Sequence, residues 1–286
     1  MSDLLHGFGL PPLYDPNDLL KSSKSLLGGS IIDGLGARPI AAVKAEPDQG
    51  AETVNELLYS EPVQILAEVP GWWFIVNLID GYMGWVPDSA VDEFDVLPSH
   101  RISAPLSHVY REPDLKSAPE VVLPMGAFVS LPGVSENGFS ELHVGGWIFN
   151  KHVTPVGHGK ADPVDTAESF IGSPYLWGGR SKLGIDCSGL VQTALAAAGY
   201  RVHRDSGAQY ASLGRALEVG ETPARGDLAF FPGHVGFMID GVHLLHANAT
   251  HMMVTIDPLE DVKGWVAKEM ADKGRTGPAF LGFRRL

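Results

Sequence analysis

Cysteine is almost absent from this chain, which contains one among its 286 residues. A single cysteine excludes an intramolecular disulfide framework and a multi-cysteine metal site, and it suits a reducing compartment. Basic residues are also scarce, with 21 lysines and arginines against 34 acidic residues and a formal net charge of −13. Because such a surface repels phosphate groups, we expect neither nucleic acid nor an anionic membrane as a partner.

Long apolar segments are missing as well. No apolar run approaches the roughly 20 residues that a helix needs to span a bilayer. The N-terminal segment has no basic region, and Pro11, Pro12 and Pro16 interrupt it, so it does not resemble a secretory signal. These observations predict a cytoplasmic protein. The chain length favours two or three domains.

Residues 36–156 have the pattern of short strands separated by turns. Three landmarks occur twice in the same order, at offsets of 66, about 65 and 62 residues. They are Glu46-Pro47-Asp48 with Glu112-Pro113-Asp114, 57–66 with 122–131, and Gly84-Trp85-Val86 with Gly146-Trp147-Ile148. The repeat predicts two small all-β barrels at 36–97 and 98–156. An N-terminal arm, 1–35, precedes them and is expected to contain a short helix at 18–27.

The remaining residues, 157–286, predict an α+β domain that follows a linker at 157–160. Asp162 and Pro163 have the pattern of an N-cap and a first helical residue. The expected helices are 164–171, 188–198 and 259–272, and the expected strands are 227–231, 234–239 and 242–247, with an edge strand at 280–284. A two-residue turn at Asp240-Gly241 is expected to join the second and third of these strands.

The single cysteine, Cys187, lies where a glycine-rich loop gives way to a helical pattern. A lone cysteine is most often a buried core thiol. Here the first turn of a helix favours a thiolate, charged Asp186 precedes the residue, and an apolar, alanine-rich segment follows it. The pattern therefore predicts a nucleophilic thiol presented at a helix tip.

A nucleophilic thiol needs a base, and two of the eleven histidines lie on predicted partner strands. A two-residue turn at Asp240-Gly241 places His234 opposite about residue 247, which makes His246 its near neighbour. One imidazole then takes the thiol proton while the other orients it. For either histidine alone, an ordinary half-exposed strand position is the simpler interpretation.

Five blocks resemble, in order and spacing, the NlpC/p60 cell-wall peptidases, which are papain-like cysteine peptidases. The blocks are PYLWGG at 174–179, DCSGLVQ at 186–192, GDLAFF at 226–231, HVGFMID at 234–240 and LLHAN at 244–248. The resemblance implies Cys187 as nucleophile, His234 as general base and His246 as the orienting residue. It implies no metal and no cofactor.

The same resemblance implies substrate and oxyanion roles near the nucleophile. Tyr175 is expected near the oxyanion site, although core packing is the alternative. Asp186 is expected to bind the free amine of the substrate, to cap the helix, or to do both. Ser188, which follows the nucleophile, is assigned to the same set of substrate-binding and oxyanion residues.

The two β repeats resemble bacterial SH3 domains. Two such domains before an NlpC/p60 domain are similar to the subgroup that cleaves γ-D-glutamyl bonds to diaminopimelate or lysine in free muropeptides. This resemblance implies that the first barrel selects a free N-terminal L-Ala. Glu61 and Tyr82 are the candidates, with an exposed strand carboxylate and a barrel aromatic as the alternatives.

The first barrel has Ser60 where the pattern usually has glycine before the glutamate. The second has Gly126 at that position and no acid after it, so a structural role is expected. The resemblance therefore predicts an enzyme of muropeptide recycling with a small peptide as its partner. An exported peptidoglycan hydrolase and an inactive wall-binding module are the alternatives.

Overall fold

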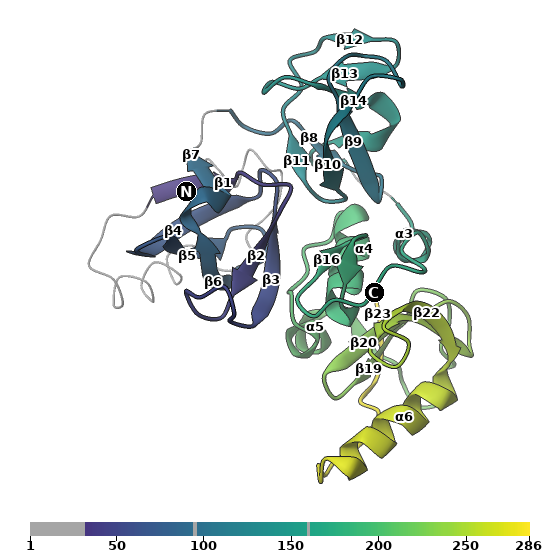
Figure 1. Ribbon diagram of the computed structural model, residues 1–286. Coiled ribbons are helices and arrows are strands. Elements are labelled where there is room, and N and C mark those ends of the chain that lie inside the picture. Colours follow the sequence, from purple (N-terminus) through teal and green to yellow (C-terminus); the bar gives the residue numbers. More distant parts are fainter. Residues whose placement is uncertain (1–31, 94–95, 159–160) are drawn as a thin grey trace. The chain divides into compact units, whose positions relative to one another are not determined.

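A computed structural model describes residues 32–93, 96–158 and 161–286 (Figure 1). The chain divides into two compact units at the junction of residues 159 and 160, inside the segment expected to be a linker. The helix expected at 18–27 lies outside the described residues. In the part of the chain that the structure describes, every helix is too short or too polar to cross a bilayer.

The first β module forms one antiparallel sheet of seven strands in the order β3-β2-β6-β5-β4-β1-β7. It begins ahead of the expected boundary at residue 36, because β1 pairs with β4 and β7. Alternating β-branched residues supply its core, including Val43, Val63 and Ile75. Its elements are β1 (Ile32–Gly36), β2 (Ile40–Lys44), β3 (Thr53–Leu58), β4 (Pro62–Val69), β5 (Trp72–Asn77), β6 (Met83–Pro87), the 3-10 helix η1 (Asp88–Ala90) and β7 (Val91–Glu93).

The second β module has the corresponding strand order, divided into sheets of five and three strands, β10-β9-β14-β13-β12 and β11-β8-β15. Its core contains Ile102, Val109 and Ile148, and Leu58 of the first module packs with them. Its elements are β8 (His100–Ile102), β9 (Leu106–Tyr110), β10 (Pro119–Pro124), β11 (Phe128–Val129), β12 (Ser135–Glu136), β13 (Phe139–Glu141), β14 (Trp147–Phe149), the 3-10 helix η2 (Asn150–His152) and β15 (Val153–Pro155).

The turn that precedes the fourth strand has the same backbone in both modules. Ser60 donates its amide N–H to the Gly36 carbonyl at 2.8 Å, and Gly126 donates to the Ile102 carbonyl at 3.0 Å. Both residues have left-handed φ angles, 55° for Ser60 and 91° for Gly126. Serine is therefore accommodated in a conformation that favours glycine, and the turn before Glu61 is intact.

The Glu-Pro-Asp landmarks also form equivalent turns. The Asp48 carboxylate accepts the Gly50 amide at 2.8 Å, and the Asp114 carboxylate accepts the Lys116 amide at 2.8 Å. Each module then ends with a 3-10 helix followed by a short strand, η1 with β7 and η2 with β15. The repeated landmarks in the sequence therefore mark a repeated backbone.

The second unit is an α+β structure around a six-stranded antiparallel sheet, β18-β23-β19-β20-β21-β22. The helix after Asp162 ends at Glu168, before the expected Ile171. The strand expected at one edge lies inside the sheet, between β18 and β19. The elements are α3 (Pro163–Glu168), β16 (Arg180–Ser181), β17 (Gly184–Ile185), α4 (Cys187–Ala197), α5 (Ser206–Ser212), β18 (Arg215–Ala216), β19 (Leu228–Phe231), β20 (His234–Met238), β21 (His243–Asn248), β22 (Met253–Pro258), α6 (Leu259–Asp272) and β23 (Gly282–Arg285).

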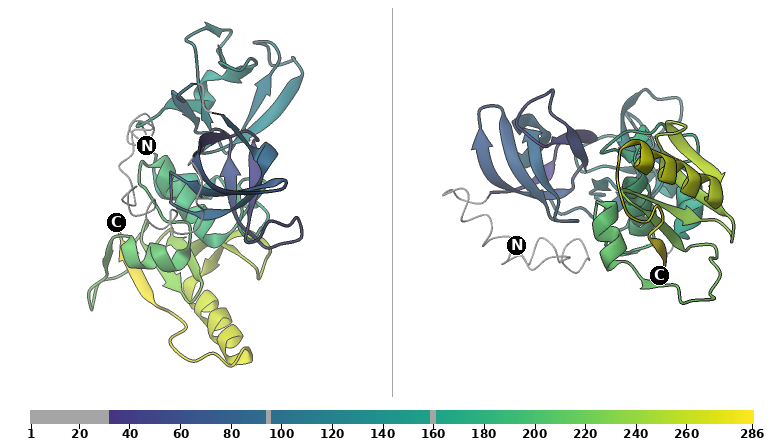
Figure 2. Two further views of the ribbon diagram at one scale, coloured as in Figure 1. Left: turned by 90° about the vertical axis from the view of Figure 1, so that its left-hand side faces the viewer. Right: turned by 90° about the horizontal axis from the view of Figure 1, so that it is seen from below.

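Two helices cover this sheet. The apolar helix α4 packs against β20 and β21. The amphipathic helix α6 lies over the strands, as Figure 2 shows, and buries Leu259 and Val262 against Phe231 and Leu244. Buried strand residues that point the other way, such as Phe237, leave the second face to α4. The first residue of α4 therefore lies beside the start of β20.

Candidate active site

Cys187 is the first residue of α4, and Asp186 is the N-cap of that helix. The Asp186 Oδ1 accepts the Gly189 amide at 2.8 Å, which satisfies one of the unpaired donors of the first turn. The helix behind Cys187 is buried along most of its length. The N-cap alternative for Asp186 is therefore confirmed, the helix begins one residue before the expected residue 188, and a rigid element positions the sulfur.

The thiol is not exposed, contrary to the expectation from the sequence. Cys187 is 6% exposed, and its Sγ lies 4.0 Å from the carbonyl oxygen of Gly233. Burial, and then the charge of Asp186, raise the pKa of the Cys187 thiol to about 12. Hydrogen bonds from the Val235 and Ser188 amides act in the opposite direction. The resting group is therefore a thiol, and a base must accept its proton during attack.

The two expected histidines are in contact. His234 opens β20, His246 lies in the middle of β21, and their Nε2 and Nδ1 atoms are 2.7 Å apart. The register differs by one residue from the expected register. The Ile239 amide donates to the His243 carbonyl, and Phe237 pairs with Leu245, so the connection is one residue longer than a two-residue turn.

This difference decides which face of the sheet the histidines share. A one-residue slip moves every side chain of a strand to the other face. With residue 234 opposite 247, the two imidazoles would point away from each other. The Asp240 carboxylate stabilises the longer connection by accepting the Val242 and His243 amides, each at 2.7 Å. Both imidazoles therefore lie on one face.

An aspartate that sequence analysis missed completes this row. Asp257, on β22, has its Oδ2 3.1 Å from His246 Nε2, and Thr255 donates its hydroxyl to the same oxygen at 2.6 Å. Burial opposes the charge of Asp257, but the Thr255 and His246 hydrogen bonds hold its pKa below the usual value. The only sequence signal for Asp257 was the alternation of side chains along β22, which places every second residue on the same face of the sheet.

Burial also governs the protonation of the two histidines. It lowers the pKa of His234 to about 3, with the neighbouring His246 as the second cause. It lowers the pKa of His246 as well, although Asp257 acts in the opposite direction. Both imidazoles are therefore neutral near pH 7, which is the state that a general base requires.

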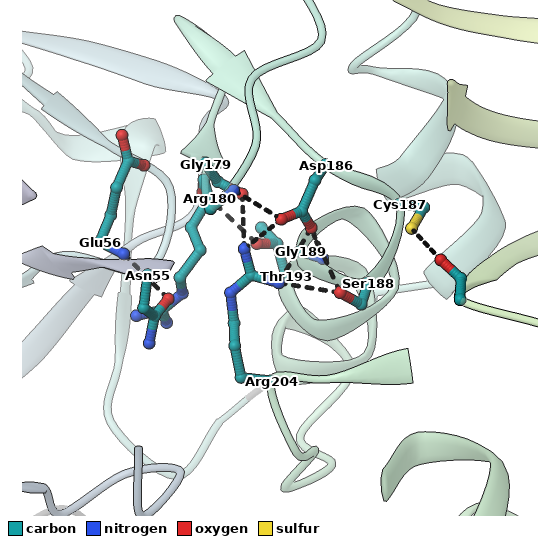
Figure 3. A network of polar contacts seen from close by, with 12 residues as sticks. Asn55, Glu56, Gly179, Arg180, Asp186, Cys187, Ser188, Gly189, Thr193 and Arg204 are labelled. Atoms are coloured by element: carbon teal, nitrogen blue, oxygen red, sulfur yellow. Dashed lines mark hydrogen bonds and ion pairs between the residues drawn. The ribbon is translucent and has the colours of Figure 1, made fainter. Parts of the chain in front are cut away.

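Asp186 has a second set of partners that the sequence did not reveal (Figure 3). Arg204, 3% exposed, forms a bidentate ion pair with it, with Nη1 to Oδ1 at 2.9 Å and Nη2 to Oδ2 at 2.5 Å. The Gly178 amide donates to Oδ2 at 2.9 Å. Arg204 also donates to the Ser188 hydroxyl at 2.8 Å. The ion pair therefore joins the glycine-rich loop to the start of α4.

Tyr175 lies beside this group. Its amide donates to the Met252 carbonyl at 2.9 Å, and the residue forms a parallel bridge with Ile185. Burial raises the pKa of Tyr175, and the nearby Cys187 and Asp186 raise it further. The phenol therefore keeps its proton and can donate a hydrogen bond near the thiol.

Glu61 and Tyr82 belong to the other unit. Glu61 is 2% exposed, and its Oε2 accepts the Leu58 amide at 3.0 Å and the Asn77 side-chain amide at 2.9 Å. The Asn77 backbone amide donates to the Tyr82 carbonyl at 2.9 Å. Asn77 thus brings the two expected residues together, although it was not itself expected. Within the described ranges, no group of three or more His, Cys, Asp or Glu side chains is arranged to hold a metal ion.

Comparisons with known proteins show which families this chain resembles. Residues 172–271 match the NlpC/P60 family, and residues 44–91 match the bacterial dipeptidyl-peptidase SH3 domain. Dipeptidyl-peptidase 6 of Lysinibacillus sphaericus is 29% identical over 78% of this chain and 90% of that protein. The γ-D-glutamyl-L-lysine dipeptidyl-peptidase of Bacillus subtilis (strain 168) is 29% identical over 71% of this chain and 74% of that protein.

A solved structure shares the fold. The crystal structure of an NlpC/P60 family protein from Bacillus cereus ATCC 10987 superposes with a TM-score of 0.72 at 20% sequence identity. The match covers 88% of this chain and 99% of that one. A fold with β modules followed by an α+β unit is therefore found in a known protein.

Proposed function

Because the chain contains an NlpC/P60 cysteine peptidase domain preceded by a bacterial dipeptidyl-peptidase SH3 domain, we propose that it hydrolyses the γ-D-glutamyl bond to a diamino acid. The substrate is a peptidoglycan-derived peptide, L-Ala-γ-D-Glu followed by diaminopimelate or lysine, with a free N-terminal amine. The name of one relative, the γ-D-glutamyl-L-lysine dipeptidyl-peptidase matched over 74% of its length, supports this bond, and the name of the other, a dipeptidyl-peptidase matched over 90% of its length, supports the release of a dipeptide. A peptide of this kind belongs to the recycling of wall fragments.

The contact between His234 and His246, next to the buried Cys187 thiol, is the observation that carries the proposal. His234 takes the thiol proton as Sγ attacks the γ-carbonyl carbon of D-Glu. The tetrahedral oxyanion accepts hydrogen bonds from the Cys187 amide and the Tyr175 phenol. The protonated His234 then donates to the departing amine, and water hydrolyses the thioester to release L-Ala-γ-D-Glu.

Recognition of the free amine is assigned to carboxylates. Glu61 presents a buried carboxylate in the module that matches the dipeptidyl-peptidase SH3 domain, with Tyr82 beside it through Asn77. Asp186 is the second candidate, but its charge is already balanced by Arg204. We therefore assign selection of the free amine mainly to Glu61. Asp186 and Ser188 are assigned a role in positioning the site.

The second β module has no acid that corresponds to Glu61, since Ala127 follows Gly126. We assign it as a second SH3-like barrel with a structural role. The repeated turns and the equivalent strand order support this assignment. Ala127 is fully buried and has only a methyl side chain, so the matching position offers no carboxylate to an amine.

The direct test is cleavage of L-Ala-γ-D-Glu-diaminopimelate and its lysine counterpart, followed by mass spectrometry of the products. We expect L-Ala-γ-D-Glu and the free diamino acid from the wild type, and no hydrolysis by Cys187→Ala. The N-acetylated peptide should not be cleaved. Equal cleavage of free and acetylated peptides would instead support a hydrolase of intact peptidoglycan stems.

The amine-binding role has its own test. Glu61→Gln should raise KM for the free-amine peptide by about tenfold or more, because a charge-assisted contact is lost. Glu68→Gln is the matched control, since Glu68 is an exposed carboxylate on β4 of the same module. An unchanged KM in Glu61→Gln would remove Glu61 from the proposal and leave the role of Cys187 standing.

A further inference from the structure

Five polar side chains lie on one face of the sheet between β20 and β22, beside Cys187. They are His234, His246, Asn248, Thr255 and Asp257. His246 is 1% exposed, so it depends on partners within the chain for its hydrogen bonds. Its Nδ1 faces His234 at 2.7 Å, and its Nε2 faces Asp257 at 3.1 Å. The row therefore forms a chain from a carboxylate to the general base.

Donor and acceptor roles along this chain follow from its carboxylate end. An ionised carboxylate only accepts hydrogen bonds. Asp257 Oδ2 accepts the Thr255 hydroxyl, and it accepts from His246 only if His246 carries its proton on Nε2. Neutral imidazole has one donor and one acceptor, so Nδ1 of His246 is then an acceptor. His234 must donate to it from Nε2.

This arrangement leaves Nδ1 of His234 with its lone pair. Nδ1 is the ring nitrogen nearest to the backbone of its own residue. The Cys187 Sγ lies beside that backbone, 4.0 Å from the Gly233 carbonyl and in contact with the Val235 amide. The lone pair is therefore on the nitrogen that is nearer to the backbone segment beside the thiol.

Asn248 favours the opposite tautomer of His246. Its Nδ2 lies 3.3 Å from His246 Nε2 and donates to Thr255 Oγ1 at 2.7 Å. The amide orientation is set by the His251 backbone N–H, which donates to Oδ1 at 2.8 Å. An N–H group facing Nε2 favours a lone pair there, which is the other tautomer of His246. Without Asp257, the chain of donors would therefore reverse.

We infer that Asp257 is a positioning residue that sets the tautomers of His246 and His234 and so leaves Nδ1 of His234 free to accept the Cys187 proton. This inference rests on the proposed roles of Cys187 and His234. In the step itself one proton moves from Sγ to Nδ1, the S–C bond forms with the sulfur electron pair, and the C=O π bond breaks as its pair moves onto the carbonyl oxygen. Asp257 remains a carboxylate and stabilises the imidazolium through His246.

Two readouts test the inference without any peptide substrate. The first is ¹⁵N NMR of labelled histidine, which distinguishes Nε2–H from Nδ1–H imidazole. We expect Nε2–H for both His234 and His246 in the wild type, and Nδ1–H for both in Asp257→Ala. Wild-type His246 in the Nδ1–H form would overturn the inference even if no variant folded.

The second readout is the rate of Cys187 alkylation by iodoacetamide, which is specific because the chain has one cysteine. Asp257→Ala should slow alkylation by about tenfold or more, by analogy with partners that orient metal-bound histidines, whose loss typically costs about 10- to 100-fold. Asp257→Asn should slow it less, since its amide oxygen still accepts from His246 Nε2. Equal rates in the wild type and Asp257→Ala would contradict the inference.

His251 offers a matched control because its Nε2 lies 3.3 Å from the other oxygen of the same carboxylate. Its side chain is 40% exposed and pairs with the Asp257 oxygen that does not face His246, so His251→Gln should leave both tautomers unchanged. With the peptide substrate, Asp257→Ala should lower kcat with little change in KM. If the tautomers and alkylation rates were as expected but the peptide were not cleaved, the proposed substrate would be refuted and this inference would stand.

Discussion

Asp186 directly precedes the nucleophile, Asp257 is linked to it through His246 and His234, and the surroundings of the two aspartates differ. Asp186 is paired with a buried arginine and also accepts backbone amides, so its charge is balanced inside the unit. Asp257 is paired with neutral His246, a threonine hydroxyl and the partly exposed His251. The first carboxylate holds two chain segments together. Within the described part of the chain, the second pairs with no buried arginine or lysine, and it can stabilise a positive charge that develops on the imidazoles.

The comparison shows how one residue type serves two purposes near a single thiol. A bidentate pair with arginine is geometrically specific, and the guanidinium keeps its charge at every accessible pH. A carboxylate next to imidazole pairs instead with a group whose pKa is lower than that of a guanidinium, so this group can gain and lose a proton. We therefore expect changes around Asp186 to affect stability first and changes around Asp257 to affect catalysis first.

The largest expected effect is on stability, from Arg204→Met. The substitution leaves the Asp186 carboxylate buried without its counter-charge, which typically costs about 3–5 kcal/mol in the free energy of unfolding. Urea denaturation would measure it. The double variant Asp186→Asn with Arg204→Met should recover part of the loss, because no uncompensated charge remains. A loss below about 1 kcal/mol for the single variant would break the comparison.

A smaller stability effect is expected for Asp257→Asn. The side chain of Asp257 is 15% exposed and has no cationic partner that is buried with it, so removal of its charge leaves no buried ion unpaired. We expect a loss of no more than about 1–2 kcal/mol, the range for one or two hydrogen bonds. The same urea measurement applies. A loss equal to that of Arg204→Met would show that both aspartates are structural.

The smallest effect concerns pH. Burial lowers the pKa of His234 to about 3 and also lowers that of His246, so the neutral base persists below the ordinary histidine pKa of about 6.5. We expect the acid limb of the kcat/KM profile to lie below pH 6.5. In Asp257→Asn it should move further down, because Asp257 favours protonated His246. An acid limb at or above pH 6.5 would contradict this electrostatic account.

Sequence analysis found the elements that depend on local signals. The Asp162 and Asp186 caps, helix 259–272 and the repeated Glu-Pro-Asp turns follow from residues close together in the chain. The contact of His234 with His246 was expected, but the register used to reach it was off by one residue. The Asp240 carboxylate binds two amides and lengthens the connection, which a two-residue turn pattern does not indicate.

The partners that were missed are distant in sequence from the residues they serve. Arg204 lies in an irregular segment after α4, and Asp257 lies one strand beyond His246, so only the fold brings each to its partner. The exposed thiol was also a wrong expectation. A helix start favours a thiolate. The burial of Cys187, however, depends on β20 packing beside it, and the residues near Cys187 in the sequence do not indicate that contact.

The central claim is that Cys187 is the nucleophile for a γ-D-glutamyl bond. Its most direct test is intact-protein mass spectrometry of enzyme quenched in acid during turnover of L-Ala-γ-D-Glu-diaminopimelate. The account predicts an L-Ala-γ-D-Glu acyl group on Cys187, absent from Cys187→Ala, together with release of free diaminopimelate. Release of diaminopimelate at the wild-type rate by Cys187→Ala, with no acyl group on the protein, would contradict it.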